Sequence, residues 1–189
     1  MAKSLRHIGK KRFPRERNRE IISRAIDHRD DRVAVITLAA LIDVGLERAI
    51  KSRMRRLKTD DYNAIFSGTG PLSGLSAKIR VAYALGIIGP LVRNDLSIIN
   101  EIRNVFAHAA QSLRLHDNRL WARLARLNAM SHLDISSWRI SLNLDSKRGK
   151  AIAAISIYAF LLSEIRFVRF PIKKLNDTLF GLTIRAIKY

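Results

Sequence analysis

The stretch from Val33 to Ile50 constrains the fold of this chain more than any other. Placed on a helical wheel, it is apolar around most of its circumference. Asp30 or Asp31 can supply the N-cap, and we expect the helix to run to about Leu57. Such a helix buries its surface only when other helices surround it. The sequence therefore predicts an all-α (mainly α) fold, a single-domain helical bundle around one long central helix.

Apolar periodicity predicts further helices on both sides of the central one. They are expected at about 20–28, from Asp60 toward Phe66, from Leu72 to Gly86, from an Asp95 cap to Ala109, from Arg119 to Met130, and from about Asp145 to Phe167. Gly89-Pro90 is expected to end the third of these helices, which begins near Leu72. Gln111–His116 and Trp138–Leu144 instead alternate apolar and polar residues, which is typical of strands and predicts one short antiparallel pair.

Composition divides the chain into three parts. Residues 1–19 are dominated by lysine and arginine, hold few apolar groups and include Pro14, so we predict a basic flexible arm. Residues 20–170 carry the helical periodicity and form the domain. Residues 171–189 are about half apolar, and they would form either a C-terminal tail or a short docking helix.

The net charge of +19 is the strongest global feature of the 189 residues. It favours a polyanionic partner, which can be nucleic acid, an acidic protein or an anionic membrane surface, although a soluble protein rich in arginine has the same charge. The longest apolar run, Ala151–Leu162, is too short to cross a bilayer, and no signal peptide is visible. We therefore expect a cytoplasmic protein with no membrane partner. The chain has no cysteine, so disulfides and thiolate metal sites are excluded.

Two groups of cations are candidates for a nucleic-acid contact. One lies in the N-terminal arm and the other at the end of the central helix, and together they comprise Lys10, Lys11, Arg12, Arg15, Arg48, Lys51, Arg53, Arg55, Arg56 and Lys58. Neutralising phosphates with such groups releases counterions and favours binding. The alternative for the first group is a solubilising tail. Part of the second group complements the negative end of the helix dipole.

Two acids stand out on the otherwise apolar central helix. Asp43 and Glu47 are four residues apart and share a face that points toward the core side. A buried carboxylate needs a cation or hydrogen-bond donors, and Arg80 and Arg103 are the candidate partners. We interpret Asp43, Glu47 and Arg80 as a structural ion-pair cluster, with a catalytic or ligand-binding role as the alternative.

A second polar cluster closes the helix that ends near Ala109. Asn104 and His108 are four residues apart and share a face, whereas Arg103 lies roughly 140° from His108 on an ideal helix. Such a cluster is either a hydrogen-bonding device that holds a neighbouring loop or a site of chemistry. No set of His, Asp and Glu residues has metal-ligand spacing, so the sequence predicts no metal and no cofactor.

Several motifs carry a resemblance to a known family. Gly70-Pro71-Leu72 followed by Ser76-Ala77-Lys78-Ile79, Ala82–Ile88, Glu101–His108 and Ala39–Glu47 resemble the mannitol operon repressor family over about residues 30–165. The resemblance implies that the 20–170 part is an all-helical regulatory domain. It implies a transcriptional regulator or co-repressor that acts through an acidic protein partner or through sequence-tolerant contact with DNA or RNA. It also implies a homodimer.

The polar cluster carries a second resemblance. Arg103-Asn104-x-x-x-His108 is similar to the Arg-x4–6-His motif of HEPN domains, many of which are metal-independent ribonucleases. This resemblance implies that Arg103 holds a phosphate and that His108 is the general acid and base, with Asn104 beside them and two sites facing across a dimer. Glu47 or Asp43 would then orient the site.

Overall fold

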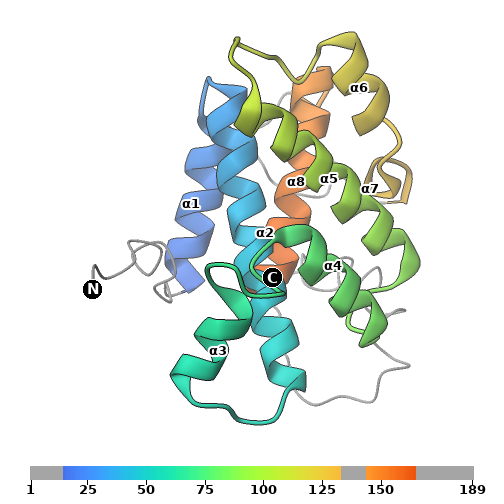
Figure 1. Ribbon diagram of the computed structural model, residues 1–189. Helices are drawn as coiled ribbons and strands as arrows, with labels where there is room; N and C mark the ends of the chain where they lie inside the picture. Colours follow the sequence, from blue (N-terminus) through green and yellow to red (C-terminus); the bar gives the residue numbers. More distant parts are fainter. Residues whose placement is uncertain (1–14, 133–143, 165–189) are drawn as a thin grey trace.

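The computed structural model describes residues 15–132 and 144–164 (Figure 1). This part of the chain forms eight helices and no strand. The helices are α1 (Arg15–Asp27), α2 (Asp31–Arg53), α3 (Thr59–Phe66), α4 (Leu75–Ala84), α5 (Pro90–His108), α6 (Asn118–Leu124), α7 (Asn128–His132) and α8 (Lys147–Glu164). The predicted mainly α fold is confirmed.

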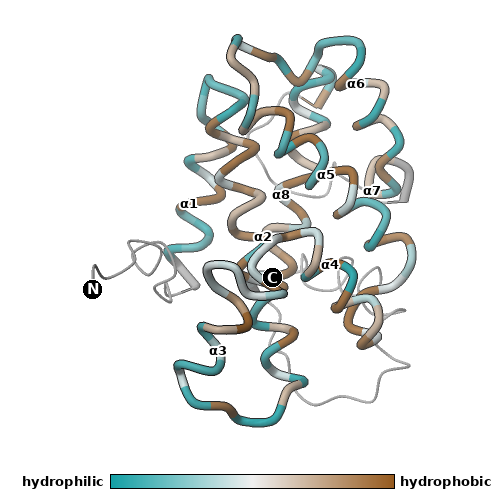
Figure 2. The backbone as a smooth tube through the Cα atoms, in the orientation of Figure 1, coloured by the Kyte–Doolittle hydropathy of each residue, from teal (hydrophilic) through white to brown (hydrophobic). Residues whose placement is uncertain are grey.

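Helix α2 is the central helix, as the sequence predicts. It packs against α1, α4, α5 and α8. Its N-cap is Asp30, whose side chain accepts a hydrogen bond of 2.8 Å from the backbone N–H of Arg32. The helix ends at Arg53, a turn earlier than expected. Figure 2 shows hydrophobic colours along α2 and α8, whereas the loop that joins α2 to α3 is mostly hydrophilic.

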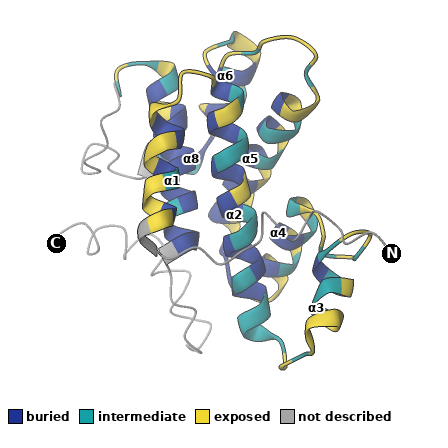
Figure 3. Cartoon of the chain, turned by 90° about the vertical axis from the view of Figure 1, so that its left-hand side faces the viewer, coloured by how far each residue is buried: buried dark blue, intermediate teal, exposed yellow. Residues whose placement is uncertain are grey.

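A glycine allows the closest helix approach in the core. A Cβ atom on Gly45 of α2 would lie 2.6 Å from the Cβ and 2.9 Å from the carbonyl oxygen of Leu162 in α8, so no larger residue fits there. The run from Ala151 to Ala159 in α8 is buried throughout. Figure 3 shows the buried residues of the inner helices in dark blue and the exposed residues on the outward side of α1 in yellow. Helices α2 and α8 therefore form the centre of the bundle.

One face of α2 stays open, which the sequence does not predict. Val33 and Ala40 are exposed, and Ile36, Thr37 and Val44 on the same side are half-buried. These five residues, which we call the α2 open stripe, carry no charge. The other α2 residues between Ala34 and Ile50 are mostly buried against the neighbouring helices.

Four sequence expectations need correction. Helix α1 begins at Arg15, before the expected start at residue 20. Gly89-Pro90 does not simply end a helix, because Pro90 is the first residue of α5; proline suits this position because its missing N–H would be unsatisfied there anyway. Gln111–His116 form a loop, not a strand, and almost all of the second expected strand lies outside the described residues, as do residues 1–14 and 165–189.

The fourth correction concerns Asp95 and the helix expected from Arg119 to Met130. That segment forms two helices, α6 and α7, and the fully buried Asp95 lies inside α5 instead of capping it. Its carboxylate accepts hydrogen bonds from the backbone N–H groups of Asn128 (2.8 Å) and Ala129 (2.9 Å) at the start of α7. It also accepts one of 2.6 Å from the Tyr158 hydroxyl of α8. Asp95 thus caps a helix distant in sequence.

A second buried carboxylate, Asp31, joins the other end of the bundle. It accepts hydrogen bonds from the backbone N–H of Leu115 (2.9 Å) and from Arg148 Nε of α8 (2.6 Å). The loop after α5 is therefore held to the starts of α2 and α8. Among the described helices, none combines the length and apolarity that crossing a membrane requires.

Candidate functional site

The cluster of Arg103, Asn104 and His108 lies on the last turns of α5. Arg103 Nη1 donates a hydrogen bond of 2.9 Å to Asn104 Oδ1, and both residues are half-buried. His108 is exposed at the end of the helix. Because Asn104 shares a face with His108, the arginine head group reaches toward that face despite the angular separation of the two residues. In the described part of the chain, no hydrogen bond joins Arg103 to His108.

The acids of α2 are neutralised by a lysine of α4. Lys78 is fully buried, and its Nζ lies 2.7 Å from Asp43 Oδ2 and 2.9 Å from Glu47 Oε2. Lys51, one turn beyond Glu47, donates to Glu47 Oε1 at 2.8 Å. We call these four residues the α2–α4 ion cluster. With two cations and two carboxylates it is balanced in charge, which is the arrangement that burial of ions requires.

The expected partner of these acids was wrong. Arg80 is exposed, and within the described residues it makes no ion pair. Arg103 contacts Asn104 instead. Asp43 and Glu47 do pair with a cation, but Lys78 of α4 supplies it.

The environment of Glu47 lowers its pKa. Burial alone would raise the pKa of this carboxyl, but the hydrogen bonds from Lys51 and Lys78 and their positive charges outweigh it and hold the pKa below 4.5. Glu47 is therefore held as a carboxylate, which suits a structural cluster. A general acid would instead need a raised pKa.

The cations at the end of α2 do not all face solvent. Lys51 Nζ lies 5.0 Å and 4.8 Å from the ring centroids of Tyr62 and Phe66 in α3. Arg48 and Arg53 are half-buried and have interaction partners. Arg55, Arg56 and Lys58 are exposed in the loop between α2 and α3. Of the cations expected in the arm, Lys10, Lys11 and Arg12 lie outside the described residues, and Arg15 begins α1.

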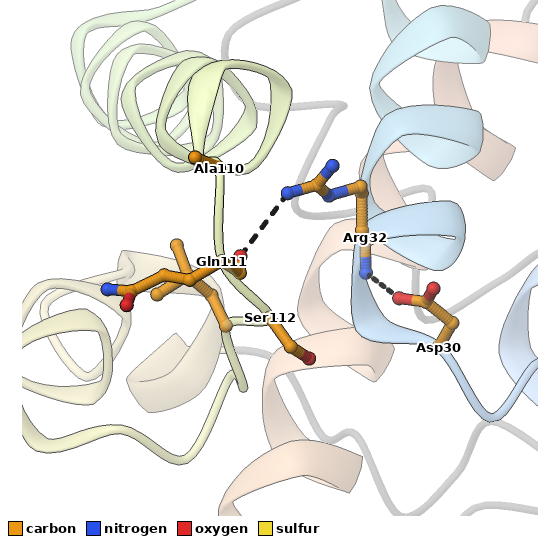
Figure 4. Close-up of a pocket in the computed structure, with 6 residues that line it drawn as sticks. Asp30, Arg32, Ala110, Gln111 and Ser112 are labelled. Atoms are coloured by element: carbon orange, nitrogen blue, oxygen red, sulfur yellow. Dashed lines mark hydrogen bonds between the residues drawn. The ribbon is translucent and has the colours of Figure 1, made fainter.

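A shallow pocket of about 240 Å³ lies between the start of α2 and the loop after α5 (Figure 4). It is lined by Asp30, Arg32, Ala110, Gln111, Ser112 and Leu113. The Arg32 guanidinium donates to the carbonyl oxygens of Ala109 (2.5 Å) and Gln111 (3.4 Å), and Figure 4 shows the second of these bonds. The sequence does not predict this pocket. Only the capping signal at Asp30 pointed to its position.

The described residues do not assemble a metal site. Nowhere in 15–132 or 144–164 do three His, Asp or Glu side chains group in a way that could hold a metal ion. The polar groups that do converge are the α2–α4 ion cluster and the Arg103–Asn104 pair. The charge-balanced α2–α4 ion cluster suits the packing of two helices, and the Arg103–Asn104 pair suits recognition of an anion.

The fold places the protein in a class of all-helical single-domain proteins with known structures. A chain of the MtlR–HPr complex from Escherichia coli matches with a TM-score of 0.57 and 16% identity, covering 77% of this chain and 95% of that one. The possible transcriptional regulator YggD from Shigella flexneri 2a matches with a TM-score of 0.55 and 11% identity, covering 84% and 98%. At these identities the likeness establishes the fold alone.

The sequence then defines the family. The model of the mannitol repressor family matches residues 36–165, so this chain belongs to that family. The comparison with curated proteins finds no match. The sequence resemblance to the mannitol operon repressor family is thereby confirmed.

Proposed function

We propose that this protein is a cytoplasmic co-regulator of transcription that acts by binding a protein partner. The observation that carries the proposal is the fold shared with a chain of the MtlR–HPr complex, together with membership of the mannitol repressor family. We propose HPr as the partner of this chain as well. The strong positive charge of the chain suits a partner with an acidic surface.

Isothermal titration calorimetry of the full chain with purified HPr from the same organism tests the proposal. We expect saturable binding with a Kd that rises with salt, because complementary charges are screened. Absence of binding at low salt and at protein concentrations well above micromolar would remove HPr as the partner.

Sequence-tolerant contact with nucleic acid is the other route that we propose for this regulator. Its described candidates are Arg55, Arg56 and Lys58, which are exposed together in one loop. Lys10, Lys11 and Arg12 of the N-terminal arm would add to the same contact. We expect the affinity for duplex DNA to fall steeply with salt and to depend little on sequence. Replacing the three loop cations with alanine should reduce the slope of log K against log salt concentration by the equivalent of about three phosphate contacts. An unchanged slope would exclude this loop as a contact with DNA.

We also propose that the regulator is a homodimer, and the α2 open stripe supports this. It is the uncharged side of a central helix on a chain of net charge +19, so two copies can meet there without apposing cations. Sedimentation equilibrium should give a dimer for the wild type and a monomer for Val33→Glu with Ala40→Glu. A matched double change on the outer face of α1, Ser23→Glu with Arg24→Glu, should stay dimeric. A wild-type monomer would contradict the proposal.

A metal-independent ribonuclease is the second candidate function. It is favoured by the Arg103–Asn104 hydrogen bond, which draws the arginine toward the face of the exposed His108. Total RNA should then be cleaved in the presence of EDTA, and His108→Ala should abolish the cleavage while His116→Ala, also exposed, should not. Intact RNA with the wild-type protein, or cleavage that survives His108→Ala, would reject this candidate.

A further inference from the structure

Exposed apolar side chains gather where α4 meets α5. Of the large apolar side chains that are exposed in the described residues, Tyr83 (38%), Leu85 (39%) and Leu91 (43%) all lie at this junction, which is a lower corner of the molecule in Figure 1. The other two, Val33 and Val105, lie on α2 and near the end of α5. Clustered exposure of this kind marks interaction surfaces more often than scattered exposure does.

Two arginines without carboxylate partners flank these side chains. Arg80 shares the exposed face of α4 with Tyr83, and Arg93 in the first turns of α5 places its Cζ 4.6 Å from the centroid of the Tyr83 ring. Within the described residues neither arginine makes an ion pair. Several other cations in the described residues, by contrast, do pair with acids, among them Arg24, Lys51, Lys78, Arg123 and Arg148.

The sequence around the junction contains no acid. No aspartate or glutamate occurs between Asp61 and Asp95, whereas Lys78, Arg80 and Arg93 all fall in this interval. Because Lys78 is buried against Asp43 and Glu47, the uncompensated charge at the surface is that of the two arginines. The junction is thus apolar at its centre, positive at its edge and free of acids along its own sequence.

The contact between Arg93 and Tyr83 prepares this surface for binding. A guanidinium stacked on an aromatic ring loses less freedom when it pairs with a carboxylate, and Tyr and Arg are the residue types that dominate interface energies. Nucleic acid fits less well, because a phosphate backbone needs a run of cations and gains little from leucine side chains.

We propose that Arg80, Tyr83, Leu85, Leu91 and Arg93, which we call the α4–α5 corner, form the docking surface for an acidic protein partner. The partner inserts an apolar side chain beside Tyr83 and places carboxylates on Arg80 and Arg93. This inference rests on the proposed function, since it assigns the surface on which the HPr-type partner binds. The corner is distinct from the Arg103–Asn104–His108 cluster and from the cations of the α2–α3 loop.

Calorimetric titration of the full chain with HPr from the organism that encodes this chain tests the α4–α5 corner as the docking surface. Tyr83→Ala and Arg93→Glu should each raise the Kd at least tenfold, and Arg80→Glu should raise it severalfold. Tyr83→Phe keeps the ring and should bind like the wild type within about twofold. Arg126→Glu is the matched control, because Arg126 is also exposed and makes no described ion pair. The Tm of each variant verifies that it folds.

The outcomes separate the two proposals. If the wild type binds HPr and the corner variants bind it equally well, the docking surface is wrong and the proposed function stands. If the wild type does not bind HPr, both are overturned. If the corner variants lose affinity for duplex DNA but keep their affinity for HPr, the corner contacts nucleic acid and the docking proposal is rejected.

Discussion

Two helix contacts in this protein bury carboxylates in opposite ways. In the α2–α4 ion cluster, Asp43 and Glu47 meet the buried Lys78, so charge is balanced by charge. At the junction of α5, α7 and α8, the donors to the buried Asp95 among residues 15–132 and 144–164 are all neutral and come from Asn128, Ala129 and Tyr158. The first contact retains some solvent access through Asp43 and Lys51, whereas Asp95 is fully buried.

The two contacts therefore differ in how strongly they respond to solution conditions. A carboxylate satisfied by oriented N–H and O–H groups depends on geometry, and salt does not screen it inside the core. Asp95 therefore fixes α7 and α8 to α5. In the α2–α4 ion cluster the lowered pKa of Glu47 makes the contact depend on pH, so α4 is attached to α2 by a contact that acid can weaken. Of the α4–α5 corner, Arg80 and Tyr83 lie on α4, whereas Leu91 and Arg93 lie on α5.

Replacing Asp95 should cause the largest loss of stability. Asp95→Ala leaves two backbone N–H groups at the start of α7 and the Tyr158 hydroxyl without a partner, and we expect it to lower the free energy of unfolding by about 3–4 kcal/mol. Urea unfolding followed by circular dichroism measures this. Asp95→Asn keeps one acceptor oxygen and should lose about half as much. A loss below about 1 kcal/mol for Asp95→Ala would show that the hydrogen bonds from these neutral donors to Asp95 contribute little to stability.

Removing Lys78 should have the next largest effect. Lys78→Met leaves Asp43 without its cation and Glu47 with Lys51 alone, so we expect a loss of about 2–3 kcal/mol in the same assay. A triple variant, Asp43→Leu, Glu47→Met and Lys78→Met, should recover to within about 1 kcal/mol of the wild type, because a packed apolar contact replaces a balanced ionic one. Failure of the triple variant to recover would mean that the ions also determine the geometry of this contact.

The two contacts also differ in how far the sequence predicts them. The i,i+4 spacing of Asp43 and Glu47 on an apolar helix indicates an acidic pair that needs a cation, and such a cation, Lys78, lies beside both acids. The identity of the cation depends on the rotation of α4 about its axis, because Lys78 and Arg80 lie on nearly opposite sides of that helix. Lysine and arginine are both almost never fully buried unless they are paired, so burial statistics do not choose between them.

The role of Asp95 follows from tertiary structure alone. An aspartate five residues after Gly-Pro looks like a helix cap, but proline is also favoured at the first position of a helix, and α5 begins at Pro90. The donors at Asn128 and Ala129 become its partners only once α7 folds onto α5. For the same reason, the α2 open stripe and the Arg32 pocket between distant segments were not predictable, whereas the central helix and the Asn104–His108 face were.

Removing the Tyr158 hydroxyl tests a single donor of the Asp95 contact. Tyr158→Phe leaves the α7 cap intact, so we expect a loss of only about 1 kcal/mol at neutral pH. Burial, together with the charge and hydrogen bond of Asp95, raises the pKa of Tyr158 well above its ordinary value of 10.0. Because the pKa of Tyr158 is higher in the folded than in the unfolded chain, its contribution to the free energy of unfolding is complete below pH 10. This contribution is lost as the pH rises above 10, because only the unfolded chain then releases the proton.

The alkaline unfolding of the two proteins separates these effects. Wild-type stability should fall more steeply than that of Tyr158→Phe above pH 10, so that their difference shrinks. Parallel pH dependences would mean that Tyr158 titrates equally in both states, which would contradict its burial against Asp95.

The smallest effect on stability should be the one at acidic pH that depends on the protonation of Glu47. Its pKa in the folded protein is lowered because the hydrogen bonds from Lys51 and Lys78 outweigh burial. A lowered folded pKa gives stability that is present above 4.5 and lost as the pH falls through the folded value. The advantage of the wild type over Glu47→Gln should therefore shrink below pH 4.5, and NMR titration of the Glu47 carboxyl should give a midpoint under that value. Lys51→Met should raise this midpoint, since it removes a hydrogen bond to the charged form. A midpoint unmoved by Lys51→Met would show that Lys78 alone sets the charge of Glu47, which would make the α2–α4 contact as enclosed as the one around Asp95.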